Sequence, residues 1–147
     1  MVSEDKLIQR FKLLDDYLDV LKEISKTEKA AFLKDKILIG SAKHYLQTSI
    51  ECCLDAANHI IGAERFRAPE DYADSFSVLG EEAILSKDLT LRLRQMAKFR
   101  NRLVHLYGDI DNQFVYKAIA DDVKDILQFR QAIIERFLSH DETSHKS

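Results

Sequence analysis

The chain has 147 residues, a length that fits one domain with a substantial buried core. Hydrophobic residues make up 46% of it and charged residues 32%, which excludes an intrinsically disordered protein, and the formal net charge of −3 makes the chain acidic as a whole. Because it has only four glycines and one proline, it has little turn chemistry for building many strands, and we expect an all-α protein without a sheet.

The first expected helix runs from about Ser3 to Ile24, with Ser3 as its N-cap. Its apolar residues recur in steps of three and four, the period of one helical face: Leu7, Phe11, Leu14, Leu18 and Leu21. Ser25 and Glu28 have the spacing of a capping box, which predicts a further turn of helix through Leu33.

A long helix is expected from about Asp35 to Gly62, with Gly62 as its C-terminal stop. One apolar stripe comprises Leu38, Ala42, Leu46, Ser49, Cys53, Ala57 and Ile60, and a second comprises Ile39, Tyr45, Ile50, Leu54 and Ile61. A helix that is apolar on two sides either lies in the centre of a bundle or shares one side with a partner subunit.

Residues 63–74 form the one long connection. Pro69 disfavours helix at the residue before it, so we expect the next helix to start near Asp74 or Ser75.

Ser86 is the expected N-cap of the following helix. The core-facing stripe of that helix comprises Leu89, Leu93, Met96, Phe99, Leu103 and Leu106. Gly108 predicts that this helix ends near Tyr107.

The last long helix is expected to be capped by Asp111 or Asn112 and to run to about Leu138. The polar tail, residues 139–147, is expected to fray. With no internal repeat or linker, residues 1–147 form a single expected domain, an up-and-down bundle of four main helices plus a short one.

Basic side chains gather in the second half of the helix that Ser86 is expected to cap. Five basic residues and no acidic one lie in this stretch: Arg92, Arg94, Lys98, Arg100 and Arg102. A local cluster of cations in an acidic protein indicates a binding site for a polyanion.

The side chains at the end of this stretch suit chemistry on RNA. Asn101 and His105 are four residues apart and share a helical face, and the long side chain of Arg100 can bend toward the same place. Histidine can take or give a proton near neutral pH, and arginine stabilises charge on phosphorus oxygens. The ribose 2′-OH could then attack the adjacent phosphate without a metal ion, leaving a 2′,3′-cyclic phosphate and a 5′-hydroxyl. A two-fold dimer would supply a second His105 as the other proton-transfer group.

A structural interpretation of the same residues stays open. His105 could cap a carbonyl, or it could pair with Asp109 or Asp111 and be oriented by that contact. The arginines could form an exposed, solvated face.

The stretch from Phe99 to Tyr107, followed by Asp109-Ile110-Asp111, resembles the signature of the HEPN superfamily. More narrowly, it resembles the HepT-like toxins, whose motif is an arginine, four residues, a histidine, one residue and a tyrosine. Here the motif falls on Arg100, His105 and Tyr107, with Asn101 as the polar residue after the arginine. Similar stretches at residues 51–61 and 72–81 extend the resemblance over roughly residues 4–138.

The resemblance implies a HEPN-like helical bundle, a homodimer with its cleft at the two motifs, and a metal-independent endoribonuclease that is a toxin. It also implies a minimal nucleotidyltransferase antitoxin (MntA-type) that transfers AMP from ATP to the motif tyrosine, here Tyr107. AMP at that position would add bulk and negative charge where RNA phosphates must lie. Some HEPN proteins are instead non-catalytic modules that bind a nucleotide or a nucleotidyltransferase partner, and this remains the alternative.

Other residues carry weaker signals. Cys52 and Cys53, the only cysteines, are adjacent on a helix and are expected to be small buried residues in a reducing cytoplasm. His44 and Tyr45 are expected to pack, and His59 to be a polar position on the same helix. No spacing indicates a metal site, no cofactor is expected, and no apolar run approaches a membrane span, so we expect a cytoplasmic protein.

Overall fold

The structure of the protein is a computed structural model that describes residues 1–105 and 110–138. Helices account for most of the described residues, and none of these residues lies in a strand, which confirms the expected all-α fold. The elements are α1 (Glu4–Ser25), α2 (Lys29–Leu33), α3 (Lys36–Ala63), α4 (Tyr72–Glu81), α5 (Lys87–Val104), α6 (Asn112–Ile133) and one π-helical turn, η1 (Ile134–Leu138). No helix in the part of the chain described is long and apolar enough to cross a membrane.

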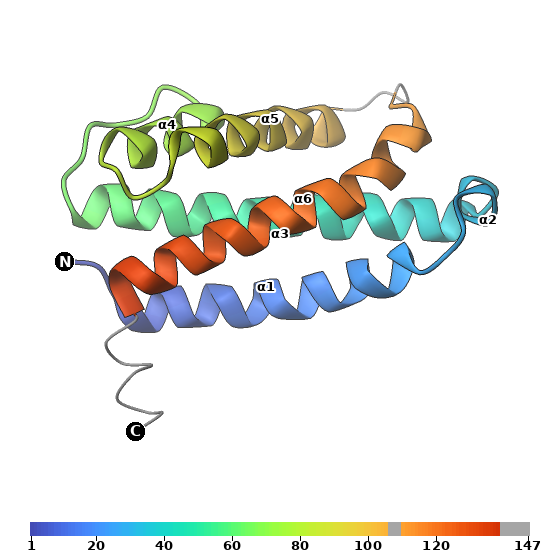
Figure 1. Cartoon of the computed structure of the whole chain (residues 1–147), viewed down its shortest axis with the longest axis horizontal. Helices are drawn as coiled ribbons and strands as arrows, with labels where there is room; N and C mark the ends of the chain where they lie inside the picture. Colours follow the sequence, from blue (N-terminus) through green and yellow to red (C-terminus); the bar gives the residue numbers. More distant parts are fainter. Residues whose placement is uncertain (106–109, 139–147) are drawn as a thin grey trace.

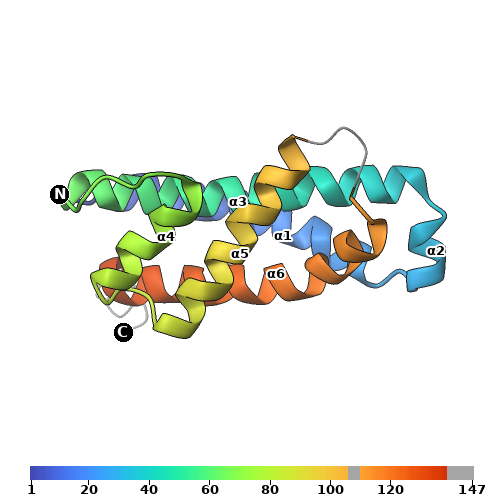
Figure 2. The same ribbon diagram turned by 90° about the horizontal axis from the view of Figure 1, so that it is seen from above.

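The long helices form the up-and-down bundle that the sequence predicts. α1 and α5 run in one direction and α3 and α6 in the other, with α4 and α5 on the opposite side of the bundle from α1 (Figure 1). Seen from above, α5 crosses obliquely over α3 and α6 (Figure 2). The two short helices lie at opposite ends, where α2 joins α1 to α3 and α4 precedes α5.

α3 is the central element, because it contacts each of the other five α-helices described. Both of its apolar faces are buried within the chain itself, and the buried set comprises Ile39, Ala42, Leu46, Ser49, Ile50, Cys52, Cys53, Leu54, Ala56, Ala57, Ile60 and Ile61. Its two-sided apolar character therefore follows from a central position and does not by itself require a partner subunit.

Side-chain caps fix where most helices begin. Backbone N–H groups of the first turn donate to the side chains of Ser3 in α1, Asp35 in α3, Ser86 in α5 and Asp111 in α6. The caps at Ser3, Ser86 and Asp111 were predicted from the sequence. α4 begins earlier than predicted, because Asp71 caps it: its Oδ1 accepts a hydrogen bond of 2.7 Å from the N–H of Asp74.

Two predicted capping roles, those of Ser25 and Gly62, are wrong. Ser25 does not cap α2; its hydroxyl donates to the carbonyl of Lys22, and Glu28 precedes α2 without a side-chain cap. Gly62 lies inside α3, and the chain leaves that helix at Arg65, whose φ of 59° is in the left-handed region that usually favours glycine.

Gly80 allows α4 to approach α5 closely. A Cβ atom on Gly80 would lie 2.6 Å from Oγ1 of Thr90, and that hydroxyl donates a 2.7 Å hydrogen bond to the carbonyl of Ser86. The threonine side chain is thus branched and tethered, so it cannot move aside easily.

We expect Gly80→Ala to lower the free energy of unfolding by about 1–2 kcal/mol, because the gain in helix propensity is smaller than the cost of forcing α4 away from α5. The matched controls are Gly40→Ala and Gly62→Ala, where nothing lies within 4 Å of the added methyl group. Both controls should raise the free energy of unfolding by about 0.5–1 kcal/mol. Urea denaturation of the three variants measures this, and a Gly80→Ala protein as stable as the controls would contradict the tight contact.

Candidate active site

Arg100 and Asn101 lie in the last turns of α5, and His105 follows its last residue. Its buried face comprises Leu89, Leu93, Met96, Ala97 and Leu103. The helix ends at Val104, earlier than the predicted end near Tyr107, and His105 is its C-cap, with φ −93° and ψ 28°. The N–H of His105 still donates to the carbonyl of Asn101 at 3.0 Å. The prediction missed this end because apolar spacing reports which side chains face the core, and not where the last helical hydrogen bond lies.

The guanidinium of Arg100 is fixed by groups from three helices. Its Nε and Nη2 donate to Oε2 of Glu51, on α3, at 3.0 and 2.5 Å. Its Nη1 donates to Oδ1 of Asn101 at 3.2 Å, and its Cζ lies 4.8 Å from the centre of the Tyr72 ring at the start of α4. The side chain is only 14% exposed, so the cation has one defined position.

Arg100, Asn101 and His105 line a single cavity of about 460 Å³. The rest of its lining comes from α3, from α4 and from the connection before α4: Asn58, Pro69, Glu70, Asp71, Tyr72 and Ser75. His105 is exposed, so its imidazole is accessible to a ligand. The three side chains that the sequence predicts to act together therefore lie at one site.

The walls of this cavity are held by their own polar contacts. Ser75 is buried, and its hydroxyl donates to Oδ1 of Asn58 at 3.0 Å. On the connection, the guanidinium of Arg67 donates to both carboxylate oxygens of Asp74, at 2.7 and 2.9 Å, and to both of Glu81. These hydrogen bonds hold the pKa of Asp74 well below its usual range and tie the connection to α4.

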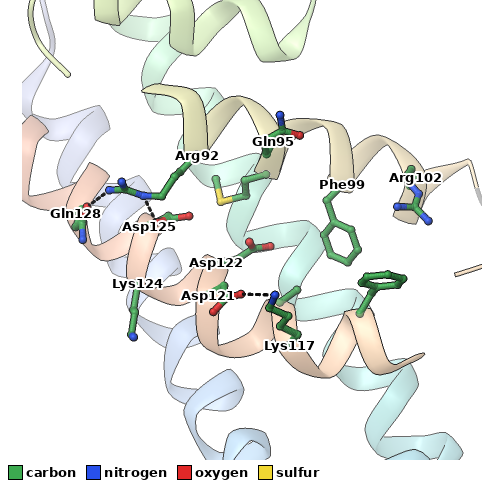
Figure 3. Close-up of a pocket in the computed structure, with 13 residues that line it drawn as sticks. Arg92, Gln95, Phe99, Arg102, Lys117, Asp121, Asp122, Lys124, Asp125 and Gln128 are labelled. Carbon is green, nitrogen blue, oxygen red and sulfur yellow. Dashed lines mark hydrogen bonds and ion pairs between the residues drawn. The ribbon is translucent and has the colours of Figure 1, made fainter. Parts of the chain in front are cut away.

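The remaining basic residues of α5 are spread around the helix. Arg92 donates to Asp125 and Gln128 across the groove between α5 and α6 (Figure 3), and Arg102 lines the same groove. Arg94 donates to the hydroxyl of Ser77, while Lys98 and Arg102 are exposed. Arg92 and Arg94 are thus engaged within the chain, and a role in RNA binding stays a prediction for Arg92, Arg94, Lys98 and Arg102.

The partly buried side chain of Asp122 lies in this groove between α5 and α6, which has a volume of about 550 Å³. Within the described part of the chain, Oδ2 of Asp122 has no hydrogen-bond partner. Burial, and to a smaller extent the nearby carboxylates of Asp125 and Asp121, raises the pKa of Asp122 to about 7. Near neutral pH this carboxyl is therefore partly protonated, which lowers the negative charge of the groove.

Two predicted site residues, Tyr107 and Asp109, lie outside the described residues. Asp111 is described, and its carboxylate accepts a 2.9 Å hydrogen bond from the N–H of Gln113 as the N-cap of α6. The role of Asp111 is therefore that of a helix cap.

Other candidate residues have structural partners. Nε2 of His59 accepts a 2.9 Å hydrogen bond from the N–H of Ser3, and burial lowers its pKa. Cys52 and Cys53 are buried free thiols, as expected, and burial raises the pKa of Cys52 to about 11. Tyr45 packs against Tyr17 with ring centres 5.9 Å apart. Among the residues described, no three His, Cys, Asp or Glu side chains are grouped to hold a metal ion.

Sequence reasoning missed two contributors to the site, Glu51 and Tyr72. Glu51 interrupts an apolar run of α3, and a carboxylate among buried neighbours is a signal that a cationic partner lies close by. That partner is far away in the sequence, so its identity could not be read from the spacing. Tyr72 follows the long connection, and nothing in its sequence neighbourhood indicates a stacked guanidinium.

The arrangement can bind an anion and move a proton. Two N–H groups of Arg100 are not used by Glu51 or Asn101, because a guanidinium has five and the described contacts occupy three. An anionic oxygen in the cavity could therefore contact Arg100 while His105 takes or gives a proton.

The sequence is similar to that of known proteins. The chain matches the family described as Ribonuclease HepT-like over residues 14–133. It is 30% identical over 102 residues to the mRNA nuclease HepT of Shewanella oneidensis, covering 69% of this chain and 77% of that protein. It is 29% identical over 113 residues to the tRNA nuclease HepT of Aphanizomenon flos-aquae, covering 76% of each.

The fold is also similar to a solved structure, that of the tri-AMPylated HEPN toxin of Shewanella oneidensis in complex with an MNT antitoxin. The TM-score is 0.82 at 25% sequence identity, and the alignment covers 89% of this chain and 98% of that one. The bundle is thus shared over nearly the whole length of both chains.

Proposed function

The chain belongs to the Ribonuclease HepT-like family, and we propose that it is an endoribonuclease toxin that cleaves RNA at the cavity lined by Arg100, Asn101 and His105. The observation that carries the proposal is that the fixed guanidinium of Arg100 and the exposed His105 line one cavity. The relatives named above, an mRNA nuclease and a tRNA nuclease, support RNA as the substrate.

In the proposed reaction the ribose 2′-oxygen bonds to the adjacent phosphorus and the bond from phosphorus to the 5′-oxygen breaks. One group takes the proton of the 2′-OH and another gives a proton to the leaving 5′-oxygen; His105 is one of these groups. Arg100 stabilises the charge that builds on the non-bridging oxygens, and Asn101 orients Arg100. Each step uses only protein side chains, so the proposed mechanism is metal-independent.

The second proton-transfer group is proposed to be His105 of a second copy of the chain. A two-fold axis close to the C-terminal end of α5 would bring the two His105 side chains to opposite sides of one phosphate. The exposed position of His105 at this end of α5 supports such an arrangement.

The proposed partner is a minimal nucleotidyltransferase antitoxin (MntA-type) that neutralises the toxin by adding AMP to Tyr107. The similarity to the tri-AMPylated HEPN toxin in complex with its MNT antitoxin supports this pairing. Tyr107 is two residues beyond His105, so an added AMP group would bring negative charge next to the place of the RNA phosphate.

We expect His105→Ala and Arg100→Ala to lower the rate of RNA cleavage by at least about 100-fold each, because one removes a proton-transfer group and the other the stabilising cation. The matched controls are His44→Ala and Arg10→Ala, which remove an exposed histidine and a half-exposed arginine outside the cavity and should cleave like wild type. Gel analysis of a digested mixture of transfer RNA and messenger RNA measures the rates, and EDTA should not change them.

Two outcomes would contradict this proposal. Loss of wild-type activity on chelation would indicate a metal mechanism. Failure of the pure wild-type protein to cut any RNA, while both variants still bind the nucleotidyltransferase, would favour a non-catalytic binding module.

Tyr107→Phe should keep RNA cleavage largely intact but abolish neutralisation, because it keeps the ring and removes only the hydroxyl that accepts AMP. Intact-mass measurement after incubation with the nucleotidyltransferase and ATP should show added AMP on wild type and on the control Tyr45→Phe, and none on Tyr107→Phe. AMP on the Tyr107→Phe protein at the wild-type level would place the acceptor elsewhere.

A further inference from the structure

We infer that Glu51 of α3 is a positioning residue of the active site, which holds one edge of the Arg100 guanidinium so that its remaining N–H groups can contact the RNA phosphate. The inference rests on the proposed nuclease function and assigns a role to a residue from a different helix than the motif.

One carboxylate oxygen of Glu51 accepts three hydrogen bonds. Oε2 of Glu51 accepts from Nε and from Nη2 of Arg100, at 3.0 and 2.5 Å, and from Nε2 of Gln47 at 3.3 Å. Gln47 lies one turn before Glu51 on α3, so it steadies the carboxylate from the same helix. Arg100 is largely shielded, with its side chain 14% exposed, and Glu51 is partly shielded, with its side chain 33% exposed.

The geometry leaves Arg100 with the donors that a phosphate needs. Glu51 occupies Nε and one N–H of Nη2, and Asn101 occupies one N–H of Nη1. One N–H therefore remains on each terminal nitrogen, the number that a two-point contact to a phosphate uses. The Tyr72 ring covers one face of the guanidinium plane at 4.8 Å, which limits tilting of the plane.

The negative charge of Glu51 is unfavourable for RNA binding, and a protein surface that served only to attract RNA would not include it. The carboxylate of Glu51 cancels the charge of the motif arginine and repels phosphates. A positioning role explains why it is there, because a misplaced cation loses rate even when it still attracts RNA. The role therefore has an unusual signature: removal of Glu51 should slow cleavage without weakening RNA binding.

The experiment compares the full chain as wild type, Glu51→Gln and Glu51→Ala, with Asp55→Ala as the matched control. Asp55 lies one turn further along α3, is exposed, and makes a 3.8 Å ion pair with Arg10 as its one salt bridge among the described residues. Its removal therefore gives the same change in charge without touching Arg100. The single-turnover rate of cleavage is measured at saturating enzyme on a mixture of transfer RNA and a messenger RNA transcript. RNA affinity is measured with the same changes in a His105→Ala background, which prevents cleavage.

We expect Glu51→Ala to lower the single-turnover rate by about 10–100-fold and Glu51→Gln to lower it less, because the amide retains an acceptor oxygen for Arg100. RNA affinity should be unchanged or tighter in both, since each removes a negative charge. Asp55→Ala should cleave at the wild-type rate. If Glu51→Ala does not fold, as judged by its circular dichroism, Glu51→Gln decides the outcome alone.

Two results would overturn the inference while leaving the nuclease function intact. One is a wild-type rate in both Glu51 variants. The other is a slower rate that is matched by weaker RNA binding or by a smaller folded fraction, which would make Glu51 a stabilising residue only. A wild-type protein that cuts no RNA would instead overturn the proposed function itself, and the inference with it.

Discussion

A guanidinium that is largely shielded from water needs a fixed negative partner, and the position of Arg100 depends on how the bundle provides one. Glu51 reaches it from α3, and the ring of Tyr72 covers it from α4. These three helices must therefore keep their relative positions for Arg100 to keep its own. The position of α4 depends in turn on the close contact at Gly80 and on the ion pairs of Arg67. The candidate active site thus depends on three packed helices and not on α5 alone.

This constraint changes how the positive charge of α5 acts. Arg92 and Arg100 are both paired with carboxylates inside the chain, so little of their charge acts over a long distance. These pairs fix the positions of the two side chains: Arg92 connects α5 to α6, and Arg100 is held where the proposed reaction needs a cation at the phosphate. If the chain binds RNA as proposed, the long-range attraction would come chiefly from exposed cations such as Lys98 and Arg102. In the proposed function, this division would separate attraction of RNA from stabilisation of the reaction.

Much of the fold could be predicted from the sequence, because helix caps and apolar periodicity are local. Ser3, Ser86 and Asp111 cap the helices that they were expected to cap, and the stripes of α3 are buried. Helix ends were less predictable: Arg65, not Gly62, takes the left-handed position. At the site, proximity of Arg100, Asn101 and His105 followed from their spacing. The contact with Glu51 could not be predicted, because 49 residues separate the partners and only the crossing of α3 and α5 brings them together.

The central claim is that this cavity cleaves RNA by attack of the neighbouring 2′-hydroxyl. Its most direct test is a pair of identical RNA oligonucleotides, one of which carries a single 2′-deoxy substitution at the nucleotide whose 3′-phosphate is cut. The account predicts a 2′,3′-cyclic phosphate and a 5′-hydroxyl from the unmodified RNA, detected by mass spectrometry, and no cleavage at that position in the substituted RNA. Cleavage of the 2′-deoxy position at the same rate, with a 3′-hydroxyl and a 5′-phosphate as products, would contradict it.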